Sequence, residues 1–174
     1  MLNALKPFSL VIKVGGALLI AASAALLALG LLTGATDTME EMSKTLGAIA
    51  EYGAIGAGAL WLVRHAVGFV KKRKMSFGHY VQMLFKLLRT YHTFIGWVVF
   101  SVATSHGVYF LLNESEHMDR VYSGLATFIG LVVLVSFGLL LQKRGKNKKY
   151  AAYKRVHQLI ALLFGLALLI HLVI

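Results

Sequence analysis

The 174-residue chain is too apolar for a soluble protein. Hydrophobic residues make up 58% of it and charged residues 14%, with a mean hydropathy of +0.73, whereas a soluble domain carries about 25% charged residues. The chain has no cysteine, which excludes disulfides, thiolate-held iron–sulfur clusters and covalently attached haem. Its net charge of +11 lies in clusters of Lys and Arg between apolar runs. This placement indicates a protein embedded in membrane lipid and not a nucleic-acid-binding protein.

Five apolar runs predict five transmembrane helices. Each run is close to the roughly 20 residues that cross the hydrocarbon core of a bilayer. The first is too long for the apolar part of a typical secretory signal, so we interpret it as a spanning helix. The second has small residues four apart, at Ala50, Ala54 and Gly58, a pattern typical of close helix packing in membranes. The predicted spans are residues 14–32, 45–63, 90–112, 121–141 and 156–174.

The segments between these runs predict no soluble domain. A basic cluster, residues 71–74, follows the second span, and the mixed segment 75–88 after it predicts an amphipathic helix that lies in the membrane interface. We therefore expect one all-α transmembrane domain over residues 1–174.

The charges of the connections predict the topology. If all five spans are real, 16 of the 18 Lys and Arg residues fall on one side of the membrane. Only Lys44 and Arg120 fall on the other side, together with all seven acidic residues. Basic segments stay in the cytoplasm. We expect a multi-pass protein of the plasma or inner membrane, with a cytoplasmic N-terminus and an outward C-terminus.

Four histidines form a repeated spacing. His92 and His106 are 14 residues apart in the third span, and His157 and His171 are 14 apart in the fifth. Fourteen residues return an α-helix to within about 40° of the same face after about 21 Å of rise. The third and fifth spans run parallel, so we expect an inner level, His92 with His157, and an outer level, His106 with His171. Paired neutral imidazoles are the axial ligands of a six-coordinate haem iron.

The spacing therefore predicts two noncovalent b-type haems between the third and fifth helices. Gly96 lies on the mostly small third-helix face between its two histidines, which leaves space for the haems. Phe164 lies at the midpoint of the matching fifth-helix face, where it would separate them. We expect Arg89, Lys154 and Arg155 to pair with the haem propionates at the inner level.

Other polar residues are weaker candidates. His65 and His79 are also 14 apart, but the basic cluster between them makes a continuous span impossible. We expect His65 to make a polar contact on the cytoplasmic side and His117 to be solvated in an acidic outer loop. Glu51, beside Tyr52 in the outer half of the second span, is placed either to relay protons to an outer quinone or substrate site or simply to meet the interface.

Two histidine pairs on the third and fifth spans resemble the ferric reductase and NADPH oxidase class of transmembrane cytochromes, and also the core of cytochrome b of quinol-oxidising complexes. The resemblance covers residues 89–174 and rests on spacing. Two equal intervals of 14 are more like cytochrome b, because the second reductase pair is usually slightly closer. The sixth helix and the flavin- and nicotinamide-binding domain of the reductases are absent from this sequence, so the resemblance implies a separate electron donor.

Two other dihaem classes resemble the sequence less. The membrane anchors of succinate and fumarate dehydrogenases place one ligand on each of four helices, whereas the first and fourth spans here have no histidine. The gamma subunit of nitrate reductase has unequal ligand spacings.

We expect transmembrane electron transfer by an oxidoreductase or an electron-transfer subunit. Electrons would pass from a cytoplasmic-side reductase or quinol, through the inner and then the outer haem, to an extracytoplasmic acceptor such as oxygen, ferric iron, a quinone or a redox protein. One alternative is a haem-bearing, quinone-reactive anchor subunit of a larger oxidoreductase. A second is a haem-free proton or metal transporter. The sequence leaves the oligomeric state open.

Overall fold

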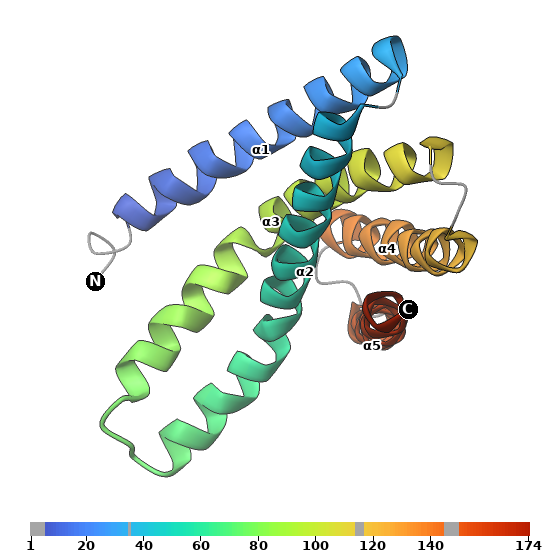
Figure 1. Ribbon diagram of the computed structural model, residues 1–174. Coiled ribbons are helices and arrows are strands. Elements are labelled where there is room, and N and C mark those ends of the chain that lie inside the picture. The colour runs from blue at the N-terminus through green and yellow to red at the C-terminus, as the bar shows by residue number, and fades with distance from the viewer. Residues whose placement is uncertain (1–5, 35, 114–116, 145–149) are drawn as a thin grey trace.

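The computed structural model consists of five helices, and it describes residues 6–34, 36–113, 117–144 and 150–174. All five helices are long and apolar enough to cross a membrane, and no strand occurs among the described residues. The predicted all-α, multi-pass membrane fold is therefore confirmed (Figure 1). The helices are α1 (Lys6–Thr33), α2 (Asp37–Lys72), α3 (Gly78–Asn113), α4 (Met118–Arg144) and α5 (Tyr150–Val173).

The ends of α2 show why the helix begins and stops where it does. Thr36 caps its N-terminus, because the side-chain oxygen accepts a hydrogen bond of 3.3 Å from the backbone N–H of Met39. Acidic residues in the first turn and basic residues in the last complement the helix dipole. These residues are Asp37 and Glu40 in the first turn and Lys71 and Lys72 in the last.

The segment 75–88 does not form a separate interfacial helix, so that prediction was wrong. A short turn follows α2, in which Lys74 adopts a positive φ of 52°. From Gly78 onward α3 runs without interruption into the predicted third span. The sequence offers a physical reason, since it has neither Gly nor Pro between His79 and Ile95 to break the helix.

Helix α3 is central to the packing. It lies along α2 over the greatest length, packs on α1, and contacts α4, which in turn pairs with α5 (Figure 1). One core joins α1, α2 and α3 around Leu26, Leu46 and Val102. Ser23 of α1 adds a hydrogen bond of 2.8 Å to Ser101 of α3, a polar contact of the kind that joins membrane helices.

A second core joins α3, α4 and α5. It is built on Val99, Leu131 and Phe164, one buried residue from each helix. This core lies where the sequence predicts the two haems to be separated, so it links the fold to the candidate site.

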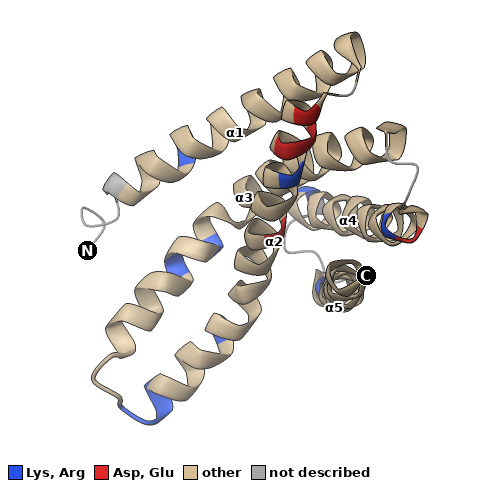
Figure 2. Ribbon diagram, in the orientation of Figure 1, with Lys and Arg blue, Asp and Glu red and all other residues tan. Residues whose placement is uncertain are grey.

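The charges are segregated along the helices (Figure 2). Asp37, Glu40 and Glu41 lie at the beginning of α2, Glu51 lies farther along the same helix, and the turn from α2 to α3 is basic. Lys44, a basic residue among those acids, is paired with Glu40 at 2.7 Å and Glu41 at 2.9 Å. The charged residues Glu114, Glu116, Lys146, Lys148 and Lys149 lie outside the described residues.

Candidate functional site

The structure brings His92 of α3 and His157 of α5 together. Their ring centroids are 6.4 Å apart and their planes are nearly perpendicular, at 84°. Both Nδ1 atoms are buried and have no hydrogen bond of ordinary geometry to any described residue. The two rings are thus held by packing.

The 6.4 Å separation distinguishes two ways in which imidazoles can face each other. In a direct N–H···N hydrogen bond of about 2.9 Å, the centroids would lie about 5.2 Å apart. With one metal ion between them, at about 2.0–2.1 Å from each nitrogen, they would lie about 6.3–6.5 Å apart. The observed separation is longer than that of a direct hydrogen bond and is close to that of two ligands of one metal ion.

The outer histidines have firmer hydrogen bonds. His106 Nδ1 lies 2.8 Å from the backbone oxygen of Ser43 on α2. His171 Nδ1 lies 3.0 Å from the hydroxyl of Ser123 on α4. His106 lies on α3 and His171 on α5, so the outer level also takes one histidine from each of these helices.

These hydrogen bonds determine which nitrogen of each outer ring carries the proton. A backbone oxygen only accepts, so His106 must donate from Nδ1. The hydroxyl of Ser123 donates its hydrogen to the backbone oxygen of Arg120, 3.0 Å away, so it accepts from Nδ1 of His171. In both neutral rings Nε2 then keeps its lone pair, as a metal ligand requires.

Phe164 lies between the two levels, as the sequence predicts. Its side chain is 9% exposed and packs with Val99 of α3 and Leu131 of α4. Ala103 and Leu168 pack against the same cluster. An apolar layer therefore fills the middle of the site.

The predicted lining and propionate partners have mixed surroundings. A Cβ built at Gly96 would have nothing within 4 Å, so the third-helix face is open there. Lys154 of α5 is partly buried and lies three residues before His157, and Arg89 of α3 lies three residues before His92, so both basic residues lie at the same end of the site as the inner level. Arg155 is exposed on the same end of α5.

Sequence reasoning missed Gly47, which lies against His106. A Cβ built at Gly47 would lie 2.6 Å from Cε1 of the ring and 2.7 Å from Nδ1. No real side chain tolerates such a contact, so the ring occupies space that only glycine leaves. The sequence pattern indicates that small residues of the second span pack against other helices. It does not show that Gly47 lies against a histidine, because His106 is on another helix.

Two glycines of α4 lie against the histidines of α5. A Cβ at Gly124 would lie 3.1 Å from Cε1 of His171, which is a tight contact, and one at Gly138 would lie 3.4 Å from Cε1 of His157, which is an ordinary van der Waals contact. Gly124 and Gly138 are themselves 14 residues apart. The same interval of 14 residues separates His157 from His171 on the antiparallel α5. This match is a signal in the sequence that could have identified the two glycines.

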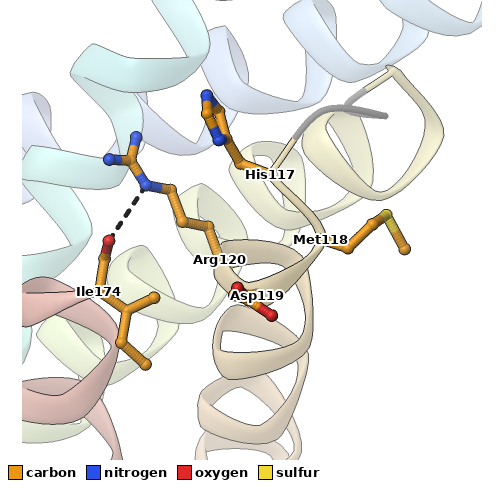
Figure 3. Close-up of a pocket in the computed structure, with 5 residues that line it drawn as sticks. All are labelled: His117, Met118, Asp119, Arg120 and Ile174. Atoms are coloured by element: carbon orange, nitrogen blue, oxygen red, sulfur yellow. Dashed lines mark hydrogen bonds between the residues drawn. The ribbon is translucent and has the colours of Figure 1, made fainter.

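The remaining histidines lie away from the two levels. His65 packs edge-on against Trp61, with ring centroids 4.6 Å apart, and His79 packs against Tyr80. His117 is exposed, as expected, and lines a pocket (Figure 3). Glu51 is partly buried.

The pocket at His117 was not predicted from the sequence. Its volume is about 280 Å³, and Arg120 closes one side by donating from Nε to the backbone oxygen of Ile174 over 3.3 Å (Figure 3). It lies next to the outer level, because Arg120 is three residues from Ser123 and Ile174 three residues from His171. The lining residues are His117, Met118, Asp119, Arg120 and Ile174.

Within the described residues, no group of three or more His, Cys, Asp and Glu side chains is arranged to hold a metal ion. The histidines instead occur as two pairs. The chain matches no protein-family model, and neither the curated proteins nor the solved structures contain a match to it. The functional inference therefore rests on residues and their geometry.

Proposed function

We propose that the protein is a transmembrane b-type cytochrome that carries electrons through two haems, each bound by two histidines. The ring separation of His92 and His157 is the observation that carries this proposal. Burying polar imidazole side chains in the hydrocarbon core of a membrane costs free energy, so histidines at such positions usually have a function. At 6.4 Å the two rings are too far apart to bond each other and are spaced as two ligands of one iron.

The outer level supports the same function by a different route. His106 and His171 both have Nδ1 committed to an oxygen acceptor, which leaves Nε2 available to a metal. Glycines of α2 and α4 lie against three of the four histidine rings, so these rings lie close to the backbones of the neighbouring helices. A flat macrocycle needs space beside its ligands, and the open face of α3 at Gly96 supports the binding of haem.

The chain's own residues would bind and orient the two groups. When bound, haem supplies reversible one-electron oxidation and reduction of its iron. His92 and His157 would ligate the inner group and His106 and His171 the outer one. Phe164 would lie in the apolar layer between them. Arg89, Lys154 and Arg155 would neutralise the propionates of the inner group.

The direction that we propose is from a cytoplasmic-side reductase or quinol to an extracytoplasmic acceptor. The basic end of the molecule would face the cytoplasm, following the positive-inside rule. Electrons would then enter at the inner level. The pocket of about 280 Å³ at Arg120 adjoins the outer level and is a candidate place for a small acceptor. The protein would act as an oxidoreductase or as the electron-transfer subunit of one.

The test is haem binding by the purified full-length protein. We expect two haems per chain and the sharp visible bands of bis-histidine haem after reduction. His92→Ala and His157→Ala should each abolish the inner haem alone, and His106→Ala and His171→Ala the outer one alone. His79→Ala is the control and should retain both haems. A purified, folded protein without haem absorption, or two haems bound in the double variant His92→Ala/His106→Ala, would show the proposal to be wrong.

A further inference from the structure

The hairpin formed by the end of α2 and the beginning of α3 is longer than a membrane requires. The apolar runs of these helices end near Val63 and begin near Thr90. Beyond them α2 continues for residues 64–72 and α3 begins with residues 78–89. At 1.5 Å per residue, these extensions measure about 13 Å and about 18 Å. We call residues 64–89 the basic hairpin.

The tip of the basic hairpin would reach the outer edge of the lipid headgroups or stand beyond it. A bilayer has about 30 Å of hydrocarbon and about 40–45 Å in total, so its headgroup layer is about 5–8 Å deep on each side. The extension of α2 exceeds that depth by roughly 5 Å and the extension of α3 by roughly 10 Å, even with the usual tilt of membrane helices. Lys71 to Lys74 at the tip would therefore lie at the outer edge of the headgroup layer or beyond it.

The basic hairpin is a rigid element. Val70 is 5% exposed and sits against Gly78, where an added Cβ would lie 3.0 Å from Cγ1 of Val70. Backbone hydrogen bonds of 3.0 Å from Arg73 to Phe69 and 3.2 Å from Met75 to Val70 close the turn. These contacts hold the backbone of the turn in one conformation, which favours recognition by a folded partner.

The charge of the basic hairpin has one sign. Seven Lys and Arg residues and no acidic residue occur between Arg64 and Arg89 (Figure 2). Positive-inside topology requires basic residues close to the membrane, but it does not require four of them at a tip that reaches the outer edge of the headgroups or beyond. Charges of one sign at that position attract an oppositely charged protein over about a Debye length.

Exposed aromatic side chains lie among these charges. Phe69 is 55% exposed, Phe77 47% and Tyr80 68%. The Arg73 guanidinium lies 5.1 Å from the centre of the Phe69 ring. Aromatic residues and arginine together are the residues most often responsible for binding energy at protein interfaces. The basic hairpin thus has both the long-range and the short-range features of a docking surface.

We propose that the basic hairpin docks the acidic surface of a small soluble redox protein, which delivers electrons to the inner level. This inference rests on the proposed function for the role of the partner, but not for its binding. The hairpin joins α2 and α3, and His92 of the inner level lies on α3 three residues beyond Arg89, where the hairpin ends.

The experiment measures binding of an acidic probe to the full chain in vesicles of neutral phosphatidylcholine. The probes are a flavodoxin and a plant-type ferredoxin, both small and acidic, and basic cytochrome c is the counter-probe. We expect the acidic probes to bind at low salt, with an affinity that falls at least tenfold on going to physiological ionic strength. The triple variant Lys71→Glu/Lys72→Glu/Lys74→Glu should lose at least tenfold in affinity.

The matched control changes equal charge on the same side of the protein. Lys6→Glu/Lys13→Glu/Lys143→Glu lies on α1 and α4 and should alter binding less than twofold. Binding of the acidic probes that is unaffected by the triple variant of the hairpin would overturn the proposal. So would an effect seen only with vesicles of anionic phosphatidylglycerol, since lipid would then be the partner. Binding of the probes can be measured whether or not the chain contains haem. A chain that binds the probes but no haem would contradict the proposed function and would leave the docking surface supported.

Discussion

The hydroxyl of Ser123 accepts a hydrogen bond from Nδ1 of His171 over 3.0 Å, because its own hydrogen is donated to the backbone oxygen of Arg120. The serine therefore fixes both the orientation and the tautomer of the ring. In metal sites such a bond makes the imidazole a stronger electron donor. At the inner level neither Nδ1 has an equivalent partner among the described residues. The two levels consequently differ in the basicity of their ligands.

Ser123→Ala should raise the midpoint potential of the outer haem. A more basic ligand stabilises ferric iron more than ferrous iron, so loss of the hydrogen bond favours the reduced state. A hydrogen bond is worth roughly 1 kcal/mol, which is of the order of 40 mV for a one-electron couple. A redox titration followed in the visible region should show one component shifted upward and the other unchanged.

Two further variants separate this effect from a loss of packing. Ser136→Ala, elsewhere on α4, removes a hydroxyl that bonds only its own helix at Val132 and should leave both potentials in place. Ser123→Thr retains the hydroxyl and should restore the original value. An unshifted titration in Ser123→Ala would mean that the hydrogen bond has no influence on the haem.

Gly47→Ala should prevent the outer haem from binding. The new methyl group would lie 2.6 Å from Cε1 of His106, so the ring must leave its position. The matched control is Gly56→Ala on the same helix, where an added Cβ meets nothing within 4 Å. This control should be neutral or slightly stabilising, because alanine favours a helix by about 1 kcal/mol over glycine. The haem-to-protein ratio of the two variants provides the comparison, and equal ratios would disprove the role of Gly47.

The sequence was sufficient to predict the helices but not the surroundings of the histidines. Hydropathy and spacing predicted five spans and placed His92 beside His157, because both depend on periodicity within single helices. The contacts of Gly47 with His106 and of Ser123 with His171 depend on how helices rotate against each other. Rotation is decided by packing across the whole bundle, which a linear pattern does not contain.

The beginning of α3 shows the opposite case, in which local information was misread. The mixed segment 75–88 has apolar and polar residues that suit a membrane interface. It also lacks any residue that would end a helix before the third span. The helix continues through this segment, and its contacts with α2, among them Val70 against Gly78 next to the turn, stabilise it.

Phe164→Ala should destabilise the bundle without removing a histidine. The ring is 9% exposed and fills the layer between the levels, so its loss leaves a cavity lined by α3, α4 and α5. Replacement of a buried phenylalanine by alanine costs about 3–5 kcal/mol in proteins. Leu163→Ala, at the neighbouring exposed position, is the control and should cost much less. Unfolding in mixed detergent measures both, and an equal loss of stability would contradict the packing of Phe164.

Single cysteines test the topology, because the native chain has none. Ser76→Cys places a thiol in the exposed turn of the basic hairpin, and Thr38→Cys places one in the first turn of α2, at the acidic end. The segregation of charge predicts that Ser76→Cys reacts with an impermeant maleimide only after the cells are opened. Thr38→Cys should react in intact cells. The reverse pattern would place the basic hairpin outside and exclude a cytoplasmic electron donor at that surface, whereas labelling of both thiols in intact cells would show that the number of spans between them is even.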